Sequence, residues 1–197
     1  MDQEKELFIR KVRSVLSLDS VQTNDQSGQL RPAAVLLPLF YDHGLWKLLF
    51  IRRSNFGEFH RGEVAFPGGA KEIVDQDMTT TAKRETQEEL GISPEFINIL
   101  GSIEPLSTIS NYFVTPVVGV LSWPTKIEQN PREVARVFSI PLQWLSDTKN
   151  WGIKEFEISG RVKISTIVYS PYDNETVWGF TAKVTVNFLQ RLKNERQ

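Results

Sequence analysis

Apolar and polar residues follow a helical period in three parts of the chain and a strand period in most of the rest. Residues 4–18 carry charged side chains between apolar ones that recur every three or four positions, which predicts an amphipathic N-terminal helix. The apolar positions are Phe8, Val12, Val15 and Leu16. The polar stretch that follows, residues 19–32, is predicted to be a connector.

Short apolar runs bounded by turn residues predict strands. Residues 33–40 and 46–51 flank the turn sequence YDHG, which favours a β-hairpin. Residues 153–169 alternate on both sides of the sequence SGR, which indicates a second hairpin. Three further segments are rich in β-branched or aromatic residues and are also expected to be strands: residues 96–103, 112–121 and 133–140.

Two more helices are expected in the second half of the chain. Pro141 suits the first turn of a short helix over residues 141–147. Residues 179–193 set Phe180, Val184 and Phe188 four apart, and we interpret this segment as a helix despite its β-branched content. Strands that interleave with helices predict an α/β or α+β sandwich.

Composition and charge narrow the class of protein and its partners. The chain has 197 residues and no obvious repeat, so we expect residues 1–30 to form the helix and connector and residues 31–197 to form one domain. With 23 basic and 24 acidic residues there is no basic excess, and we expect neither nucleic acid nor a membrane as partner. A homodimer is left open.

The absence of cysteine excludes disulfides, thiol nucleophiles and zinc–thiolate sites together. Any metal ion must therefore bind through oxygen or histidine. Because no segment has the length and apolar content of a signal peptide or a membrane span, we expect a cytoplasmic protein.

The most informative segment is an acidic helix predicted over residues 79–90, which Gly91 would end. Its glutamates Glu85, Glu88 and Glu89 lie at positions i, i+3 and i+4, so they share one face. Like charges so placed destabilise a helix by about 0.2 to 0.5 kcal/mol per pair. The inward stripe is expected to be Ala82, Thr86 and Leu90.

A cation is expected to offset this repulsion. Arg84 can pair with Glu88 at i+4, but one guanidinium does not neutralise three carboxylates, whereas Mg²⁺ or Mn²⁺ binds such oxygens readily. The alternative is a solvated acidic face without a ligand.

The sequence FPGG at residues 66–69 strengthens the metal hypothesis. We expect its glycines to form a tight loop after a strand, which lets the backbone approach the helix. A chain returning from that loop would bring the Gly69 carbonyl and Glu72 near the glutamates. The alternative is a plain turn.

The segment RETQEELGI, residues 84–92, resembles the signature of the Nudix hydrolase family. Arg84, Glu85, Glu88, Glu89, Gly91 and Ile92 stand at matching positions. Thr86 replaces the usual aliphatic residue, and the loop from Gly69 is one residue longer than the general pattern, with Asp75 or Gln76 at the place of the usual loop glutamate.

The longer loop resembles the coenzyme A pyrophosphatase-like branch of the family, as do residues 111–120, 133–145 and 176–184. That branch has a second signature before FPGG, and every spacing of it is present from Arg53 and Ser54 to Gly69. Glu58 stands where the signature has an arginine. Loss of an arginine–phosphate contact of roughly 1.5 to 3 kcal/mol corresponds to an affinity about ten to several hundred times weaker.

The resemblance implies a Nudix-type α/β/α sandwich with a mixed sheet, and a metal-dependent pyrophosphohydrolase. Its substrate would be a small nucleoside-diphosphate derivative such as coenzyme A or acyl-coenzyme A. Alternatives are ADP-ribose, nucleotide sugars, NADH or modified nucleoside triphosphates. The glutamates argue against a nucleotide-binding module without turnover, which has no need of them. The absence of a basic tract from this chain argues against an RNA-end hydrolase or an RNA-binding protein.

The resemblance also assigns residues. The implied ligands of Mg²⁺ or Mn²⁺ are Glu85, Glu88, Glu89, Gly69 and Glu72, and the implied catalytic residues are Glu88, Glu89 and Arg84. Arg84 would orient the glutamates, and Glu88 or Glu89 would be the general base, with Glu133 and Glu104 as weaker candidates. The substrate-binding candidates are Arg52, Arg53, His60 and Arg61.

Overall fold

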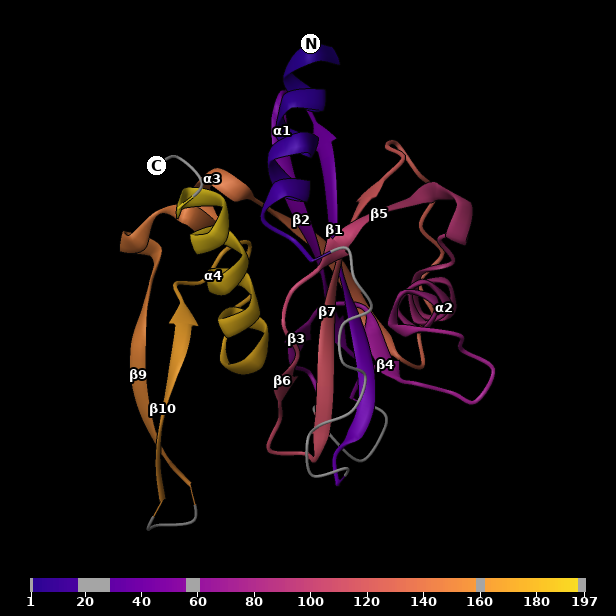
Figure 1. The fold of residues 1–197 in the computed structure, drawn as a ribbon. Coiled ribbons are helices and arrows are strands. Elements are labelled where there is room, and N and C mark those ends of the chain that lie inside the picture. Colours follow the sequence, from indigo (N-terminus) through magenta and orange to yellow (C-terminus); the bar gives the residue numbers. More distant parts are fainter. Residues whose placement is uncertain (1, 18–28, 56–60, 159–161, 195–197) are drawn as a thin grey trace.

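The computed structural model describes residues 2–17, 29–55, 61–158 and 162–194 (Figure 1). Its centre is an antiparallel hairpin of β1 (Arg31–Asp42) and β2 (Leu45–Arg53). His43 and Gly44 both have positive φ angles, 47° and 83°, and make the turn between the two strands. The hairpin expected from YDHG is confirmed.

Among the described residues, eight strands form one mixed sheet. β7 (Tyr112–Leu121) runs parallel to β1, and β5 (Ile97–Ser102) and β6 (Leu106–Ser107) pair antiparallel with β7. On the other side, β8 (Val134–Pro141) and β3 (Val64–Ala65) pair with β2. β4 (Gly68–Ala70) pairs antiparallel with β1.

The side chains of β1 alternate between two hydrophobic cores, as the strand period requires. Leu37 and Leu39 enter one core, whereas Leu36 and Phe40 enter the other. The first core also contains α1 (Asp2–Ser14), α3 (Leu142–Ser146) and α4 (Gly179–Asn194). The second core contains α2 (Met78–Leu90). Helices therefore cover both faces of the sheet, and the α/β/α sandwich is confirmed (Figure 1).

The N-terminal helix packs on the domain as its amphipathic pattern predicts. Val12 and Leu16 are buried in the first core, and Phe8 stacks on Trp46 of β2 with ring centroids 4.5 Å apart. The helix ends at Ser14, four residues before the expected end.

The remaining described elements are two short 3₁₀ turns, a second hairpin and the C-terminal helix. The 3₁₀ turns η1 (Pro94–Phe96) and η2 (Thr148–Asn150) precede β5 and β9. β9 (Trp151–Ile158) and β10 (Val162–Tyr169) form the expected second hairpin, which extends beside α4 (Figure 1). Helix α4 is confirmed because Val184 and Phe188 are buried on its inner side.

One local expectation is wrong. Gly68 and Gly69 do not form a tight loop but lie within strand β4, where they pair with Val35 and Ala34 of β1. Because these two residues have no side chains, the strand can approach both β1 and helix α2 closely. None of the described helices has the length and apolar content needed to cross a bilayer.

Candidate active site

Helix α2 is defined at both ends by its own sequence. The Asp77 side chain accepts a hydrogen bond of 2.7 Å from the Thr80 amide and caps the N-terminus. Gly91 has a φ of 67° and donates its amide to the Gln87 carbonyl at 2.8 Å, which closes the C-terminus. The expected inward residues Ala82, Thr86 and Leu90 are fully buried.

The three glutamates of α2 lie at different depths. The side chain of Glu88 is 51% exposed, that of Glu85 is 16% exposed and that of Glu89 is 2% exposed. Because α2 packs against β1 and β4, the same helical face runs from solvent into the protein interior. The site therefore contains two desolvated carboxylates and one exposed carboxylate.

The glycines of β4 make room for two of these carboxylates. A Cβ on Gly69 would lie 2.5 Å from Oε1 of Glu85, which is closer than real contacts allow. The Gly68 amide donates to Oε2 of Glu89 at 3.0 Å. A Cβ on Gly68 would lie 2.3 Å from the Ala34 carbonyl oxygen, so this position is also closed to other residues.

Arg84 is held by the loop that joins β4 to α2. Asp75 in this loop is buried, and its carboxylate accepts from Nε and Nη2 of Arg84 at 3.1 and 3.0 Å. Nη2 also donates to the Ala70 carbonyl at 3.0 Å. Asp75 further accepts from the Glu72 amide at 2.9 Å and from the Thr81 hydroxyl at 3.0 Å, which fixes the loop.

The remaining guanidinium nitrogen of Arg84, Nη1, contacts acidic residues of the site. Nη1 of Arg84 donates to Glu85 at 3.0 Å and to Glu88 at 2.8 Å, and it lies 3.9 Å from Oε1 of Glu72. The expected pair of Arg84 and Glu88 is confirmed. In the part of the chain that the structure describes, no three acidic or imidazole groups converge as a ready metal site. Arg84 instead lies among the carboxylates.

Arg53 and Arg52 have separate surroundings because successive residues of β2 point to opposite faces. Nη2 of Arg53 donates to the Gly68 carbonyl at 3.1 Å and lies 3.8 Å from Oε1 of Glu89. Arg52 lies instead near Glu175, with Nη1 and Oε1 3.4 Å apart. Of the two arginines, only Arg53 contacts the acidic helix.

Burial raises the pKa of Glu89 to about 8, although Arg53 and the Gly68 amide act in the opposite direction. Burial also raises the pKa of Glu85, while Arg84 partly offsets this. The negative charge of Glu133 adds to both increases. By contrast, the hydrogen bonds from Arg84 hold the pKa of Asp75 below its ordinary value.

The segment before β8 brings Glu133 to this cluster. The Asn130 amide donates to the Glu89 carbonyl at 2.9 Å, and Nδ2 of Asn130 donates to Oε1 of Glu133 at 3.1 Å. Ser54, the residue directly after β2, donates its hydroxyl to the Arg132 carbonyl and its amide to the Glu133 carbonyl. Four hydrogen bonds therefore connect α2, β2 and Glu133.

The other candidates are placed elsewhere or not described. Glu104 forms an ion pair with Arg191 of α4, on the sheet face opposite α2. Arg61 is exposed. His60 and Glu58 lie outside the described residues.

Three residues that organise the site had no assigned role in the sequence analysis. Asp75 was noted only as a position in the loop, and the contacts of Ser54 and Asn130 with the segment before β8 are not local in sequence. No periodicity connects these residues with α2. The one signal in the sequence is the position of Asp75, six residues after Gly69 in the loop that precedes the acidic helix.

A mixed sheet between helices, with an acidic helix against a strand of two glycines, defines an α/β/α protein with a candidate hydrolytic site. The sequence pattern of the NUDIX domain matches residues 29–159. The chain therefore belongs to the Nudix family and is a Nudix hydrolase.

Relatives and solved structures agree with this assignment. The Nudix hydrolase NudL of Pectobacterium atrosepticum is 39% identical over 157 residues, which span 79% of this chain and 80% of that protein. The NudL protein of Photorhabdus laumondii is 34% identical over 163 residues, which span 83% and 86%.

The structural likeness is to other Nudix folds. A MutT/nudix family protein from Enterococcus faecalis matches 96% of this chain and 74% of its own, with a TM-score of 0.55 and 16% identity. An Ap4A hydrolase from C. elegans matches 56% of this chain and 80% of its own, with a TM-score of 0.50 and 22% identity. At these identities the likeness shows the fold alone.

Proposed function

We propose that this Nudix hydrolase cleaves the diphosphate linkage of a small nucleoside-diphosphate derivative with the help of Mg²⁺ or Mn²⁺. The observation that carries this proposal is a pair of carboxylates on α2, the partly buried Glu85 and the buried Glu89, whose pKa values are both raised. Buried negative charge without full compensation favours a divalent cation. Among the described residues, two partly exposed arginines, Arg53 and Arg84, lie against these carboxylates.

The donor set suits a hard cation. Glu85, Glu88 and Glu89 offer carboxylate oxygens, and Glu72 and the Gly69 carbonyl are further candidate ligands nearby. When bound, the metal supplies compensation of the diphosphate charge and a more acidic water for in-line attack on phosphorus. Arg84 is a positioning residue in this proposal, because it contacts the carboxylates and is itself fixed by Asp75.

The general base is proposed to be Glu88 or Glu89. Glu88 is the accessible member of the cluster, whereas Glu89 lies inside it beside the Gly68 amide. Glu133 is an alternative, since its carboxylate is exposed, is held by Asn130 and acts electrostatically on the cluster. The ion pair of Glu104 with Arg191 on the opposite face leaves Glu104 without support as a base.

The substrate proposal is coenzyme A or acyl-coenzyme A, because the spacing of the second signature from Arg53 to Gly69 is complete. The contact of Arg53 with Gly68 and Glu89 supports a role of this signature at the site. The alternative substrates are ADP-ribose, nucleotide sugars, NADH, modified nucleoside triphosphates and dinucleoside polyphosphates. The last class is the one that the name of the C. elegans relative implies for that protein.

The test is a phosphate-release screen with Mg²⁺ or Mn²⁺ over these substrates, coupled to a phosphatase. Turnover of coenzyme A with release of a nucleoside bisphosphate supports the proposal. Turnover of another member alone would reassign the substrate. Binding without turnover of any member would support the nucleotide-binding alternative and refute the proposed activity.

The metal-site proposal is tested by the variants Glu88→Gln and Glu89→Gln. Each should lower kcat by about 10² or more, because the amide keeps the shape but lacks the charge. Glu155→Gln, an exposed glutamate on β9, is the matched control and should keep full activity. Full activity in both helix variants would refute the assignment.

The Glu58→Arg variant tests the substrate branch. We expect it to raise kcat/KM for coenzyme A by about tenfold or more, since it restores the arginine of the signature. If hydrolysis of coenzyme A does not rise while other activity is kept, Glu58 is not what limits this substrate.

A further inference from the structure

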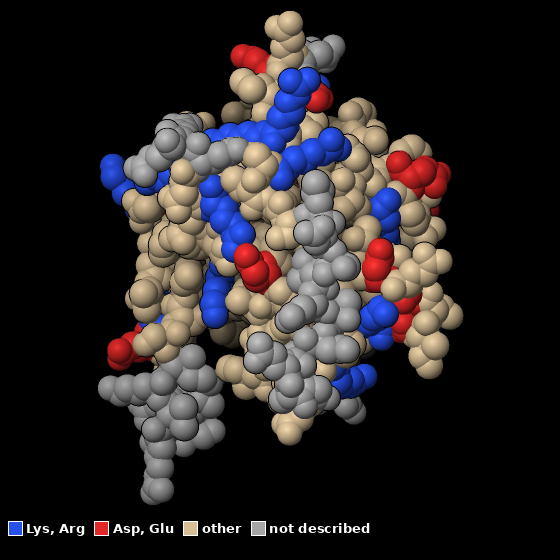
Figure 2. Space-filling model, viewed as in Figure 1, with Lys and Arg blue, Asp and Glu red and all other residues tan. Residues whose placement is uncertain are grey.

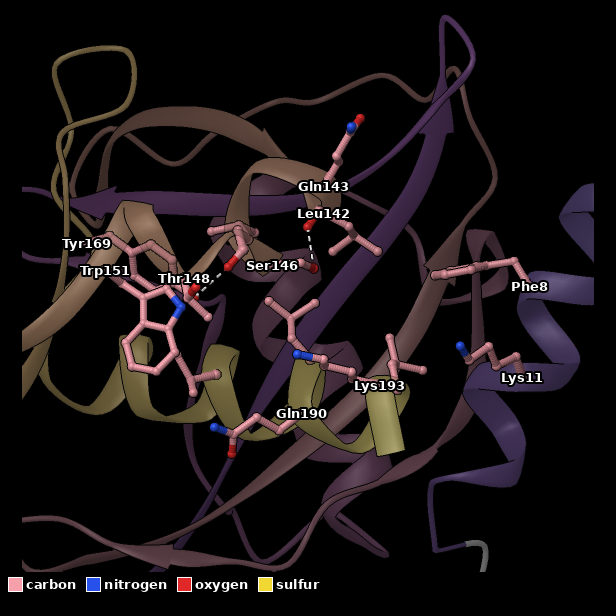
Figure 3. Close-up of a pocket in the computed structure, with 14 residues that line it drawn as sticks. Phe8, Lys11, Leu142, Gln143, Ser146, Thr148, Trp151, Tyr169, Gln190 and Lys193 are labelled. Atoms are coloured by element: carbon pink, nitrogen blue, oxygen red, sulfur yellow. Dashed lines mark hydrogen bonds between the residues drawn. The ribbon is translucent and has the colours of Figure 1, made fainter. Parts of the chain in front are cut away.

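A cleft with a volume of about 420 Å³ lies between α1, α3 and α4 (Figure 3). These helices belong to the first core, so the cleft lies on the sheet face opposite α2 and its carboxylates. Its size falls within the range of about 300 to 1,000 Å³ that is usual for small-molecule pockets. Neither the family assignment nor the proposed hydrolysis uses this cleft.

The wall of the cleft is mainly apolar and is already rigidly packed. Leu145 and Tyr169 are buried, and the Tyr169 hydroxyl donates to the Leu145 carbonyl at 3.2 Å. Phe8 from α1 and Trp151 from β9 are partly buried at its sides. A rigid apolar wall favours a ligand with an alkyl or aromatic body, because such a ligand removes this surface from water.

The charges at the cleft have one sign. Lys11 of α1 and Lys193 of α4 line it, and among the described residues no aspartate or glutamate does. Neither ammonium takes part in an ion pair within the described ranges of the chain. Figure 3 shows Lys11 on α1 and Lys193 on α4 among the residues that line the cleft. The electrostatic complement of this opening is an anion.

The charged residues around the cleft also favour an anionic ligand. The last turn of α1 holds Lys11 and Arg13, and the last turn of α4 holds Lys193 together with Arg191, whose charge is paired with Glu104. Figure 2 shows Lys and Arg side chains gathered over α1 and the adjoining end of α4. Positive charge is therefore concentrated around an apolar cleft, although the chain as a whole has a formal charge of −1.

We propose that the cleft between α1, α3 and α4 binds an amphipathic anion, which places an acyl or alkyl chain against the apolar wall and a carboxylate or phosphate beside Lys11 and Lys193. The ligand class is set by the two features together. A neutral apolar molecule would leave the lysines without partners, and a small inorganic anion would leave the apolar wall exposed.

Isothermal titration calorimetry of the full chain with three probes of equal chain length tests the proposal. The probes are decanoate, decyl phosphate and decanol. We expect decanoate and decyl phosphate to bind at least about tenfold more tightly than decanol, because decanol lacks the charge. The ratio of the first two affinities distinguishes a carboxylate ligand from a phosphate ligand.

Two variants locate the site. Lys11→Gln combined with Lys193→Gln should weaken binding of both anions by about five- to tenfold, since each exposed ion pair contributes little by itself. Gln190→Trp, at the rim of the cleft, should abolish binding by filling it. Lys183→Gln is the matched control, an exposed lysine of α4 that does not line the cleft. Thermal melting checks that every variant is folded.

The proposal is overturned if neither anion binds at millimolar concentration, or if decanol binds as tightly as the anions. It is also overturned if the double lysine variant and the Lys183 control bind equally well. Persistent binding in the folded Gln190→Trp variant would place the anion at another site and overturn the assignment of this cleft.

Discussion

Glu89 should make the metal-free protein less stable as the pH rises through neutrality. Its carboxylate is 2% exposed, and burial raises its pKa from 4.5 to about 8. Between these two values the folded protein keeps the proton while the unfolded chain releases it. The contribution of Glu89 to stability is therefore full below about pH 4.5 and is lost as the pH rises towards 8.

The size of this effect follows from the linkage of protons to folding. One proton retained on folding changes the free energy of unfolding by about 1.4 kcal/mol per pH unit. From pH 5.5 to 7.5 the loss due to Glu89 alone is thus about 2 to 3 kcal/mol. This is a large fraction of the total stability of a folded domain, which is about 5 to 15 kcal/mol.

The assay is urea unfolding in the presence of EDTA at pH 5.5, 6.5 and 7.5, for the wild type and for Glu89→Gln. Because other groups also titrate, the informative quantity is the difference between the two proteins at each pH. We expect the wild type to lose stability relative to Glu89→Gln as the pH rises. Mg²⁺ at pH 7.5 should restore wild-type stability and should have little effect on the variant.

Parallel pH profiles of the two proteins would refute the reasoning, since Glu89 would then be ionised in the folded state at its ordinary pKa. A gain of stability with rising pH, relative to the variant, would show the opposite sign and would mean that Arg53 and the Gly68 amide outweigh burial.

Three further changes have defined outcomes. Gly69→Ala should lower kcat by about tenfold or more with little loss of stability, because the new Cβ displaces only the flexible carboxylate of Glu85; activity assays and melting curves compare the two effects. Asp75→Asn should lower both activity and stability, the latter by about 3 kcal/mol in urea unfolding, because Arg84 loses its buried charged partner. Thr86→Val should change stability by less than about 1 kcal/mol, since the Thr86 hydroxyl bonds only within its own helix.

Matched controls separate these outcomes from general effects of substitution. Gly152→Ala places a Cβ where no atom lies within 4 Å and should leave activity unchanged. Asp147→Asn alters an exposed aspartate at a turn and should cost far less stability than Asp75→Asn. Equal losses in a variant and its control would contradict the role given to Gly69 or Asp75.

The sequence predicted the elements of the fold well because hydrophobic periodicity reports which faces are buried. The helices at the two ends, the hairpin of β1 and β2 and the acidic helix all follow from that period. The conformation of Gly68 and Gly69 did not follow from it. Glycine is compatible with both a turn and a strand. The close approach of Ala34 to Gly68 and of Glu85 to Gly69 shows why this strand needs residues without a side chain.

The candidate site was predictable as far as its residues lie on one helix. The helical spacing placed Glu85, Glu88 and Glu89 on one face, and the pair of Arg84 with Glu88 followed from the same geometry. Their graded burial did not follow, because it depends on how α2 lies on β4. The ion pair of Asp75 with Arg84 joins a loop to the helix. Contacts of this kind produce no periodic pattern in the sequence, so they could not be predicted from it.

The mixed sheet has a consequence for engineering this protein. Its two faces carry separate cores that share no residue, with the acidic helix on one and the lysine-lined cleft on the other. Substitutions without common neighbours usually have additive effects on free energy. The effects of substitutions at Glu89 and at Lys193 on the free energy of unfolding should therefore add. Either face can be redesigned without compensating changes on the other.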